Sequence, residues 1–245
     1  TLLSGVAHEL NNPLSNISSS AQILKEYLPA APAGAAEPSF QQQLIHDIDQ
    51  ESRRAARIVR SLLDYVRERD FEQRPVNLAE LFDETLRFLK TQRPPGIEVR
   101  LDVPPDLVVG ADRARLQQAF INLIGNAFEA IGDYGELGIE AHRAQAGDPT
   151  DAALPVLAGA CRPGTPVVDI RFSDTGPGIP PALLTRVFDP FFTTKPVGEG
   201  TGLGLFIVHE IVEEHGGCIG VENVPEGGAR FHIRLPVADT NREKP

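Results

Sequence analysis

Asp174-Thr175-Gly176-Pro177-Gly178-Ile179 follows a short run, Val167 to Phe172, in which apolar residues predominate. The run predicts a β-strand, and the Gly-Pro-Gly that follows predicts a loop at its end. An Asp at a strand end beside glycines can accept a hydrogen bond from an exocyclic amine such as that of adenine. Asp and Gly also form ordinary turns. This stretch therefore indicates a mixed α/β region with a candidate nucleotide site.

A second loop follows, and it has the composition of a phosphate site. Phe188-Asp-Pro-Phe-Phe-Thr193-Thr194-Lys195 contains three Phe that could anchor one end of the loop, while Thr193, Thr194 and Lys195 face phosphates. Alternating glycines at 198, 200, 202 and 204 then precede an amphipathic helix predicted at 202–215. Glycines before a helix N-terminus free N–H groups for phosphate and permit a lid that opens and closes. The string is neither a dinucleotide fingerprint nor a Walker loop.

The segment 112–131 predicts a helix with an apolar stripe and an adjacent polar face. The stripe consists of Leu116, Phe120, Leu123, Ala127 and Ala130. Asn122, Asn126 and Glu129 share the polar face at +4 and +3 spacing. Asn carbonyl oxygens are hard neutral ligands suited to Mg²⁺, which also uses waters and substrate phosphates. Taken alone, the three residues are equally well explained as an ordinary solvated face.

The first part of the chain predicts a helical hairpin. Heptad spacing over residues 1–28 joins Leu3, Ala7, Leu10, Leu14, Ile17, Ala21, Leu24 and Leu28. A Pro- and Gly-containing stretch around 29–38 interrupts it, and a second seam joins Leu44, Ile48, Glu51, Ala55, Ile58, Leu62 and Tyr65. Each helix offers one apolar stripe, so we expect the hairpin to pair with a second copy as a four-helix bundle.

His8 lies beside this seam, so its side chain should reach solvent or a partner domain. Glu9 can accept the Nδ1 proton while Nε2 attacks a phosphorus. Asn12 lies one turn away on the same face, where its amide could position a water near a phosphohistidine. Pro13 should bend the helix beside His8. By itself, His8 is more simply read as a solvated helix histidine.

The composition sets limits on partners and compartment. A formal charge of −11 disfavours sequence-independent nucleic-acid binding, and it means that an anionic nucleotide would need a metal ion and backbone N–H groups. Cys161 and Cys218 have no CxxC partner, so we expect reduced structural cysteines in a cytosolic setting. No apolar run approaches the ~20 residues that span a bilayer. Because the chain begins at Thr1 within a helical pattern and contains no Met, we expect a fragment whose full-length protein could be membrane-anchored upstream.

Taken in order, these strings resemble the sensor histidine kinases of two-component systems over nearly the whole chain. Ser4 to Pro13 resembles the H box, and Asn122 to Ala130 resembles the N box. Asp174 to Gly178 resembles the G1 box, Phe188 to Lys195 the F box and Gly200 to Leu205 the G2 box. His215-Gly-Gly217 is similar to the family's strand entry.

The resemblance implies an all-α hairpin, a four-helix bundle as a homodimer, followed by an α/β two-layer sandwich of the Bergerat type. It places a dimerisation and phosphotransfer domain at 1–73, an ATP-binding domain at 74–240 and a tail at 241–245. Expected elements of the sandwich are helices at 78–92, 112–131 and 202–215, strands at 97–102, 107–110, 136–143 and 166–173, and a final hairpin at 217–235.

The resemblance also implies roles for residues. His8 would be the phosphoacceptor, Glu9 its general base and Asn12 the residue linked to dephosphorylation of a response regulator. Asn126 would bind Mg²⁺ and Asp174 would recognise adenine, with residues 189–201 as an ATP lid. Further ATP-site residues would be Asn122, Glu129, Gly176, Gly178, Phe188, Thr193, Thr194, Lys195, Gly200, Thr201, Gly202, Leu203 and Gly204.

Two other functions compete with the kinase. A hydrolytic ATPase of the same superfold would carry a Glu four residues before the metal-binding Asn, where this chain has Asn122. A non-catalytic dimerisation module would not need His8, Glu9, Asn126, Asp174 and the lid glycines together. Whether phosphorylation occurs in cis or in trans, and what the Ala- and Pro-rich insertion at 145–165 does, are both left open.

Overall fold

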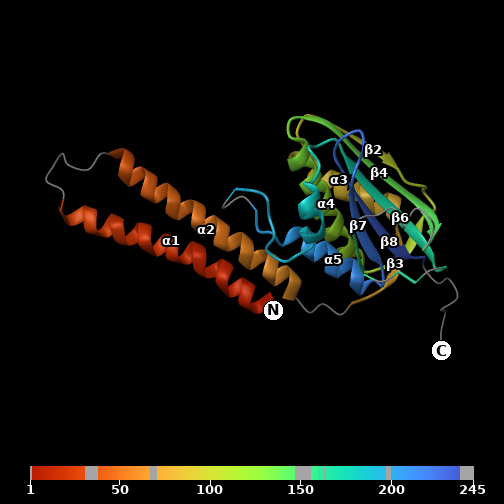
Figure 1. Ribbon diagram of the computed structural model, residues 1–245, viewed down its shortest axis with the longest axis horizontal. Coiled ribbons are helices and arrows are strands. Elements are labelled where there is room, and N and C mark those ends of the chain that lie inside the picture. The colour runs from red at the N-terminus through yellow and green to blue at the C-terminus, as the bar shows by residue number, and fades with distance from the viewer. Residues whose placement is uncertain are drawn as a thin grey trace. The chain divides into compact units, whose positions relative to one another are not determined.

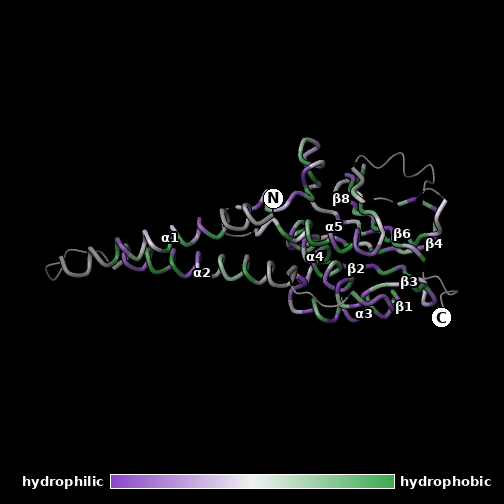
Figure 2. Tube along the Cα trace, turned by 90° about the horizontal axis from the view of Figure 1, so that it is seen from below, coloured by the Kyte–Doolittle hydropathy of each residue, from purple (hydrophilic) through white to green (hydrophobic). Residues whose placement is uncertain are grey.

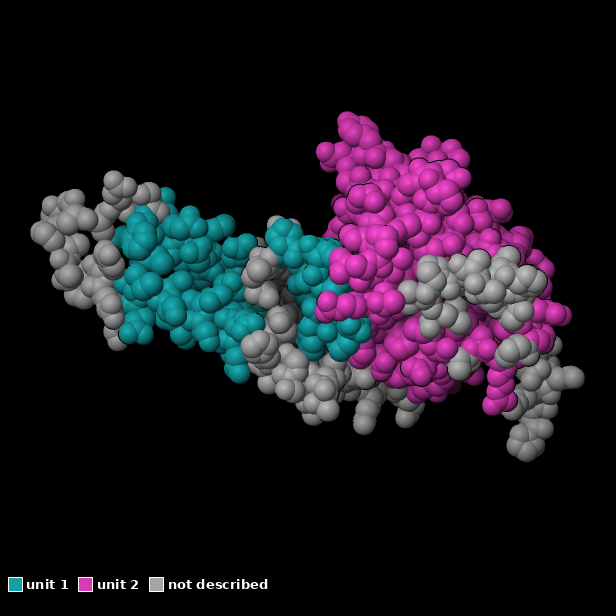
Figure 3. All heavy atoms as spheres, in the orientation of Figure 1, with its two compact units in different colours: residues 1–68, 189–203 teal, residues 69–188, 204–245 magenta. Residues whose placement is uncertain are grey.

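The computed structural model describes residues 2–30, 38–66, 71–146, 156–159, 161–162, 164–196 and 200–237. The expected tail, 241–245, lies outside these residues. Close contacts divide the chain into two compact units, one comprising 1–68 with 189–203 and the other 69–188 with 204–245 (Figure 3). Within the described ranges, none of the helices has the length and hydropathy needed to span a bilayer.

The first unit contains a hairpin of two long helices, α1 (Leu2–Ala30) and α2 (Pro38–Val66), which pack side by side (Figure 1). Where the two helices are coloured by hydropathy, hydrophobic and hydrophilic stretches alternate along them (Figure 2). Pro13 is buried, and α1 continues through it although a proline removes one helical N–H donor. Leu44 is buried on α2, and Asn16 Nδ2 donates to Glu51 Oε1 at 3.1 Å, joining the two helices.

The single hairpin does not bury the predicted seam as one stripe. Leu14 is 53% exposed and Ala21 is also exposed, while Leu10 and Ile17 are half-buried. On α2, Ile45 is 56% exposed. The heptad pattern correctly predicts the helices. However, the residues of the predicted seam fall on two faces in the single hairpin: one face packs between α1 and α2, and the other is exposed.

The second unit is built on a six-stranded sheet of order β2-β4-β6-β8-β7-β5. Its strands are β2 (Gly96–Asp102), β4 (Tyr134–Gln145), β5 (Val156–Gly159), β6 (Pro166–Asp174), β7 (Cys218–Asn223) and β8 (Ala229–Pro236). The β2–β4 pair is parallel and the other pairs are antiparallel. A separate antiparallel pair joins β1 (Arg74–Asn77) to β3 (Val108–Ala111). The sequence did not predict β1, although it placed the start of the ATP-binding domain at residue 74.

Helices cover one face of this sheet and complete a two-layer α/β sandwich (Figure 1). They are α3 (Leu78–Phe88), which continues into a 3-10 turn at Leu89–Thr91, α4 (Arg113–Ile131) and α5 (Gly204–Glu214). The core centres on Phe82, Phe120 and Phe172, whose ring centroids lie 4.4 to 5.8 Å apart. This confirms the predicted fold class of a helical region followed by a sandwich.

Helix α4 follows the predicted pattern except at its end. Asp112 caps its N-terminus by accepting hydrogen bonds from the N–H groups of Ala114 and Arg115, both at 3.1 Å. The buried residues are Leu116, Ala119, Phe120, Leu123, Ile124, Ala127 and Phe128. Ala130, expected in the core stripe, is exposed because it lies in the last turn before Gly132 ends the helix at φ 79°.

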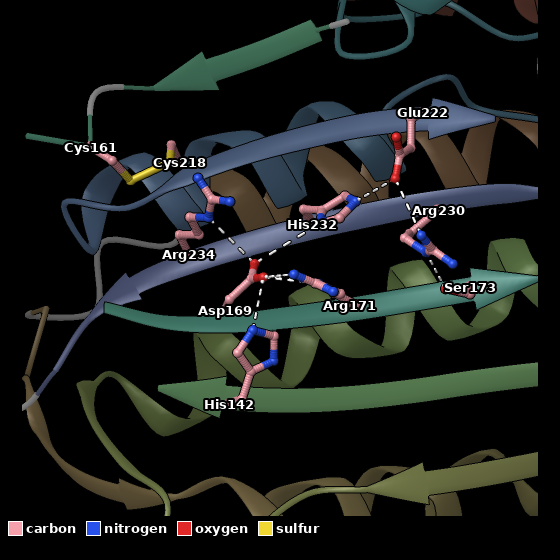
Figure 4. Close-up of polar contacts among 10 residues, drawn as sticks. All are labelled: His142, Cys161, Asp169, Arg171, Ser173, Cys218, Glu222, Arg230, His232 and Arg234. Carbon is pink, nitrogen blue, oxygen red and sulfur yellow. Dashed lines mark hydrogen bonds and ion pairs between the residues drawn. A yellow bond between two sulfur atoms is a disulfide. The ribbon is translucent and has the colours of Figure 1, made fainter. Parts of the chain in front are cut away.

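The composition of the insertion at 145–165 indicates a long hairpin or a loop, and in the structure the insertion adds a strand to the edge of the sheet. Strand β4 extends to Gln145, and β5 pairs antiparallel with the edge of β7, with Val156 opposite Val221. A disulfide joins Cys161 to Cys218 and fixes the chain just after β5 to the first residue of β7 (Figure 4). The expectation of two reduced cysteines was therefore wrong, because the fold brings together thiols that lie 57 residues apart in the sequence.

The sheet face opposite the helices carries a row of charges that cross the strands (Figure 4). Asp169 on β6 pairs with Arg171 at 2.8 Å and with Arg234 of β8 at 3.4 Å. His232 Nε2 lies 3.0 Å from Glu222 Oε1 on β7. Asp169 is only 1% exposed, and His232 and Arg234 are also buried, although their positions alternate with apolar ones in the sequence.

Candidate functional site

Asp174 is the last residue of β6, and it is 7% exposed. Its Oδ1 accepts hydrogen bonds from the N–H of Gly176 at 2.8 Å and from the N–H of Ala229, the first residue of β8, at 3.2 Å. Both of these hydrogen bonds end on Oδ1, and neither involves Oδ2. One carboxylate oxygen is thus fixed by the backbone, and the other is left to accept a hydrogen bond from a ligand.

The surroundings of Asp174 alter its acidity. Burial raises the pKa of its carboxyl above the ordinary value, and the two backbone hydrogen bonds from Gly176 and Ala229 partly oppose this shift. A partly desolvated carboxylate with two fixed donors makes strong directional bonds, because water competes with a ligand less effectively in such a place. The site can therefore select a ligand amine by its position.

Glycines allow other segments to approach Asp174 closely. A Cβ at Gly176 would lie 3.0 Å from the carbonyl oxygen of Ala130 in α4, and one at Gly228 would overlap the carbonyl of Asp174. Gly228 also has φ 93°, which a residue with a side chain rarely adopts. Thr175 ties the loop to β4, since its Oγ1 accepts from the N–H of Glu136 at 2.9 Å.

Helix α4 presents two of the predicted amides to the start of α5. Asn122 and Asn126 are both half-buried, and Asn122 Nδ2 donates to the carbonyl of Gly204 at 3.4 Å. A Cβ at Gly204 would lie 3.9 Å from Asn126 Nδ2. The amide groups therefore stand beside the first N–H groups of α5, where an anion is favoured. Glu129, one turn further along, is exposed.

The predicted lid residues, considered within their own unit, fold back on themselves. The chain at Phe191 lies against Gly202, since a Cβ at Gly202 would overlap the Phe191 backbone. Both have positive φ, 66° for Phe191 and 64° for Gly202. Thr193 Oγ1 accepts from the N–H of Lys195 at 3.1 Å, and Thr201 Oγ1 accepts from the N–H of Leu203 at 3.4 Å.

The remaining lid residues differ in exposure. Leu203 is buried and Gly200 and Lys195 are half-buried, while Thr194 is exposed. Just before this segment, Phe188 is 9% exposed and packs against the rings of His209 in α5 and Phe231 in β8, as expected of an anchor.

The hairpin residues expected to carry the chemistry all lie on α1. The side chains of His8 and Glu9 are outside the described part of the structure, and only their helical backbone is assigned. Asn12 is half-buried, one helical turn from His8.

Two residues of the Asp174 surroundings were missed by the sequence analysis. Asn223, the last residue of β7, binds both backbone groups of Ile179 through its side chain, and Ala229 donates to Asp174. The available signal was the polar Asn-Val-Pro-Glu-Gly-Gly stretch between two apolar runs, which predicted a hairpin turn but not what the turn contacts.

Comparison with known families identifies the arrangement. Residues 111–239 match the family model described as "Histidine kinase-, DNA gyrase B-, and HSP90-like ATPase". The chain belongs to this family. Residues 1–70 match the model of the "His Kinase A (phospho-acceptor) domain", and the two matches together place the chain among the sensor histidine kinases of two-component systems.

Curated relatives agree with this family assignment. The chain is 36% identical over 247 residues to the sensor histidine kinase ZraS of Escherichia coli strain K12, covering 99% of this chain and 46% of the relative. It is 31% identical over 245 residues to the sensor protein FixL of Bradyrhizobium diazoefficiens, covering 98% of this chain and 44% of that protein. The chain thus spans about half the length of the curated relatives it matches.

Solved histidine kinases share its fold. The histidine kinase ThkA, solved in complex with the response regulator protein TrrA, matches 96% of this chain and 60% of its own with a TM-score of 0.66 at 30% identity. A catalytic domain of ThkA matches 67% of this chain and 96% of its own with a TM-score of 0.52 at 32% identity.

Proposed function

We propose that this chain transfers the γ-phosphoryl group of ATP to Nε2 of His8 and then to an aspartate of a response regulator receiver domain. The observation that carries the proposal is Asp174, which is buried at the end of β6 and fixed by two backbone hydrogen bonds to Oδ1. This acceptor belongs to the same unit as Asn126 and the start of α5, in a chain whose first helix carries His8-Glu9. We assign phosphotransfer to 1–73, ATP binding to 74–240 and a tail to 241–245.

In this proposal ATP is held at its two ends. Asp174 Oδ2 accepts from the adenine amine, while N–H groups at the start of α5 bind phosphate oxygens together with the lid residues Thr193, Thr194, Lys195, Gly200 and Thr201. Lys195 supplies positive charge in a chain whose formal charge is −11. Gly176, Gly178, Gly202, Leu203 and Gly204 shape the backbone around the nucleotide, and Phe188 anchors the lid.

The residues present are compatible with Mg²⁺. Asn126 is half-buried beside Gly204, so its carbonyl oxygen can serve as the protein ligand while ATP and water complete the coordination. The metal would neutralise charge on the β- and γ-phosphates. Asn122 supports this place by bonding Gly204, and Glu129 lies at its exposed edge.

The transfer needs little covalent chemistry from the protein. The lone pair of His8 Nε2 forms a bond to the γ-phosphorus, the bond from phosphorus to the bridging oxygen breaks, and ADP leaves with that electron pair. Glu9 accepts the Nδ1 proton, which removes the positive charge from the imidazole. Asn12, one turn away, would orient water for dephosphorylation of the regulator. Positioning and charge neutralisation therefore dominate the rate.

Hydrolysis of ATP is the competing reaction, and Asn122 argues against it. A hydrolase needs a base near the γ-phosphate, and an amide cannot act as one. The side chain of Asn122 donates to the Gly204 carbonyl at 3.4 Å, which is a bracing contact.

We further propose that the hairpin acts as a homodimer. Leu14, Ile45 and Val59 are 53%, 56% and 39% exposed, and a second hairpin would cover such residues in a four-helix bundle. A receiver domain would dock on this bundle near His8. Because ATP is supplied inside the cell, we place this part of the protein in the cytoplasm.

The decisive experiment is incubation with Mg²⁺ and ATP labelled at the γ-position. We expect acid-labile, base-stable label on the wild type and none on His8→Ala, while His46→Ala, which alters an exposed histidine on α2, labels normally. Asn126→Ala should also abolish labelling without affecting dimerisation. Label that persists on His8→Ala would refute the proposal.

A further inference from the structure

The loop from Asp174 to Ile179 is held at both of its ends by one β-hairpin. Asn223 ends β7 and Ala229 begins β8, and the two residues face each other in register. The N–H of Ala229 donates to Asp174 at one end of the loop, and the side chain of Asn223 binds Ile179 at the other.

The bond between Asn223 and Ile179 is reciprocal. Asn223 Oδ1 accepts from the N–H of Ile179 at 2.8 Å, and Asn223 Nδ2 donates to the carbonyl of Ile179 at 2.6 Å. The side-chain amide thus pairs with a peptide group as a neighbouring strand would. This pairing needs a donor and an acceptor on one short side chain, which Asn provides.

The loop is shaped to receive this amide. Gly178 has φ 73°, and a Cβ there would lie 2.9 Å from Asn223 Oδ1. Any side chain at residue 178 would therefore collide with the side-chain amide of Asn223.

Fixing Ile179 restricts the short chain back to Gly176, whose N–H holds Asp174 Oδ1 at 2.8 Å. Without the hydrogen bonds from Asn223 to Ile179, the loop would be held only at its Asp174 end. The Asp174 carboxylate would then sample a wider range of orientations. Asp174 Oδ2 is an acceptor and so favours an adenine amine over the carbonyl that guanine carries at the same position, and a poorly oriented carboxylate loses part of this preference.

We propose that Asn223 is a positioning residue for nucleotide-base recognition, acting on Asp174 through Ile179 and Gly176. This inference rests on the proposed function, because it takes Asp174 as the adenine acceptor. Asn223 sets affinity and base selectivity, and it contributes nothing to phosphoryl transfer once ATP is bound.

The test compares Asn223→Ala with Asn77→Ala in the full chain. Asn77 is a matched control, since its side chain also makes two backbone hydrogen bonds, to Pro105 at 2.6 Å and from Glu80 at 3.1 Å, at the start of α3. We expect Asn223→Ala to raise the Kd for ATP about tenfold, as the loss of two modest hydrogen bonds implies. The ratio of GTP to ATP affinity should rise, and the rate at saturating ATP should stay within about twofold. Asn77→Ala should lower the melting temperature without changing the Kd.

Asn223→Asp provides a second variant of nearly the same shape that is expected to fold. It keeps an acceptor for the Ile179 N–H but places a carboxylate against the Ile179 carbonyl, so its Kd should rise at least as much as that of Asn223→Ala.

Different outcomes separate the two proposals. If the wild type does not bind ATP, or if Asp174→Asn binds it as tightly as the wild type, the proposed function fails. If binding depends on Asp174 but both Asn223 variants match Asn77→Ala in Kd and base selectivity, the positioning role is overturned.

Discussion

The helical hairpin and the α/β sandwich differ in how far they bury their large apolar side chains. In the sandwich, Phe82, Phe120 and Phe172 contact one another and are at most 2% exposed. In the hairpin, Leu14 and Ile45 remain more than half exposed. The sandwich therefore completes its core within one chain, whereas the hairpin has an apolar face that a second copy can cover.

The largest effect on stability is expected from a substitution in the core of the sandwich. Phe120→Ala should lower the free energy of unfolding of the sandwich by about 3–5 kcal/mol, because it leaves a cavity among close-packed rings. Denaturant unfolding followed by a probe in the sandwich measures this. Phe88→Ala is the matched control, since Phe88 is 62% exposed and its loss should have little effect. Equal losses in the two variants would contradict this description of the core.

The Cys161–Cys218 disulfide should contribute the next largest effect. It closes a loop of 57 residues, so Cys161→Ser should lower the stability of the sandwich by about 2–4 kcal/mol. Reduction of the wild type by a small dithiol should have the same effect and should not change Cys161→Ser further. Cytoplasmic thiols would favour the reduced form, so thiol trapping before cell lysis would show which form is present. A variant as stable as the oxidised wild type would show that the bond stabilises nothing.

The hairpin should respond to a surface change that the sandwich would tolerate. Leu14→Glu should weaken dimerisation by at least about tenfold, because it places a charge on the face that the second copy would cover. Sedimentation equilibrium measures the dissociation constant, and unfolding of the sandwich should not change. Ser19→Glu is the control, because Ser19 is also exposed but lies on a different face of the same helix, and it tests whether added charge alone is enough. A monomeric wild type would contradict the dimer directly.

The smallest effect is a pH dependence of the sandwich. His215 is 3% exposed; its Nε2 accepts from the Asp112 N–H at 2.9 Å, and its Nδ1 lies 2.6 Å from the Ile211 carbonyl. Burial lowers the pKa of His215, so the folded form holds the neutral ring. The unfolded chain then binds a proton first as the pH falls. Stability should be constant above the ordinary His pKa of about 6.5 and decline below it.

Urea unfolding midpoints on either side of that pH measure this decline. His215→Gln, which keeps a donor and an acceptor, should show a smaller decline. Burial lowers the pKa of His232 as well, so part of the decline should remain in that variant. An identical decline in His215→Gln and the wild type would exclude His215 as a source.

The sequence predicted the elements better than the contacts between them. The apolar run from Val167 to Phe172 identified β6, because that signal is local. Asp174 could be selected for the same reason, since it follows the strand directly. Asn223 could not, because its partner Ile179 lies 44 residues away and no pattern indicates which turn meets which loop.

The errors have related physical causes. Cys161 and Cys218 were judged by spacing, but sheet pairing of β5 with β7 decides their proximity. Asp169 occupies a position that normally faces solvent, and its burial is accompanied by pairing with Arg171 on the same strand and with Arg234, His142 and His232 on neighbouring strands. Leu14 fits a heptad seam, yet the sequence does not say whether the second helix or a second copy covers it.

The most direct test of the central claim, that ATP bound in the sandwich phosphorylates the hairpin at His8, is mapping of the phosphorylated residue. The intact chain would be incubated with Mg²⁺ and ATP, digested at neutral to mildly basic pH to preserve phosphoramidates, and sequenced by mass spectrometry. We predict one phosphorylated residue, His8, in the wild type and none in Asp174→Asn. Phosphate on another residue, or equal phosphorylation of His8 in Asp174→Asn, would contradict this account.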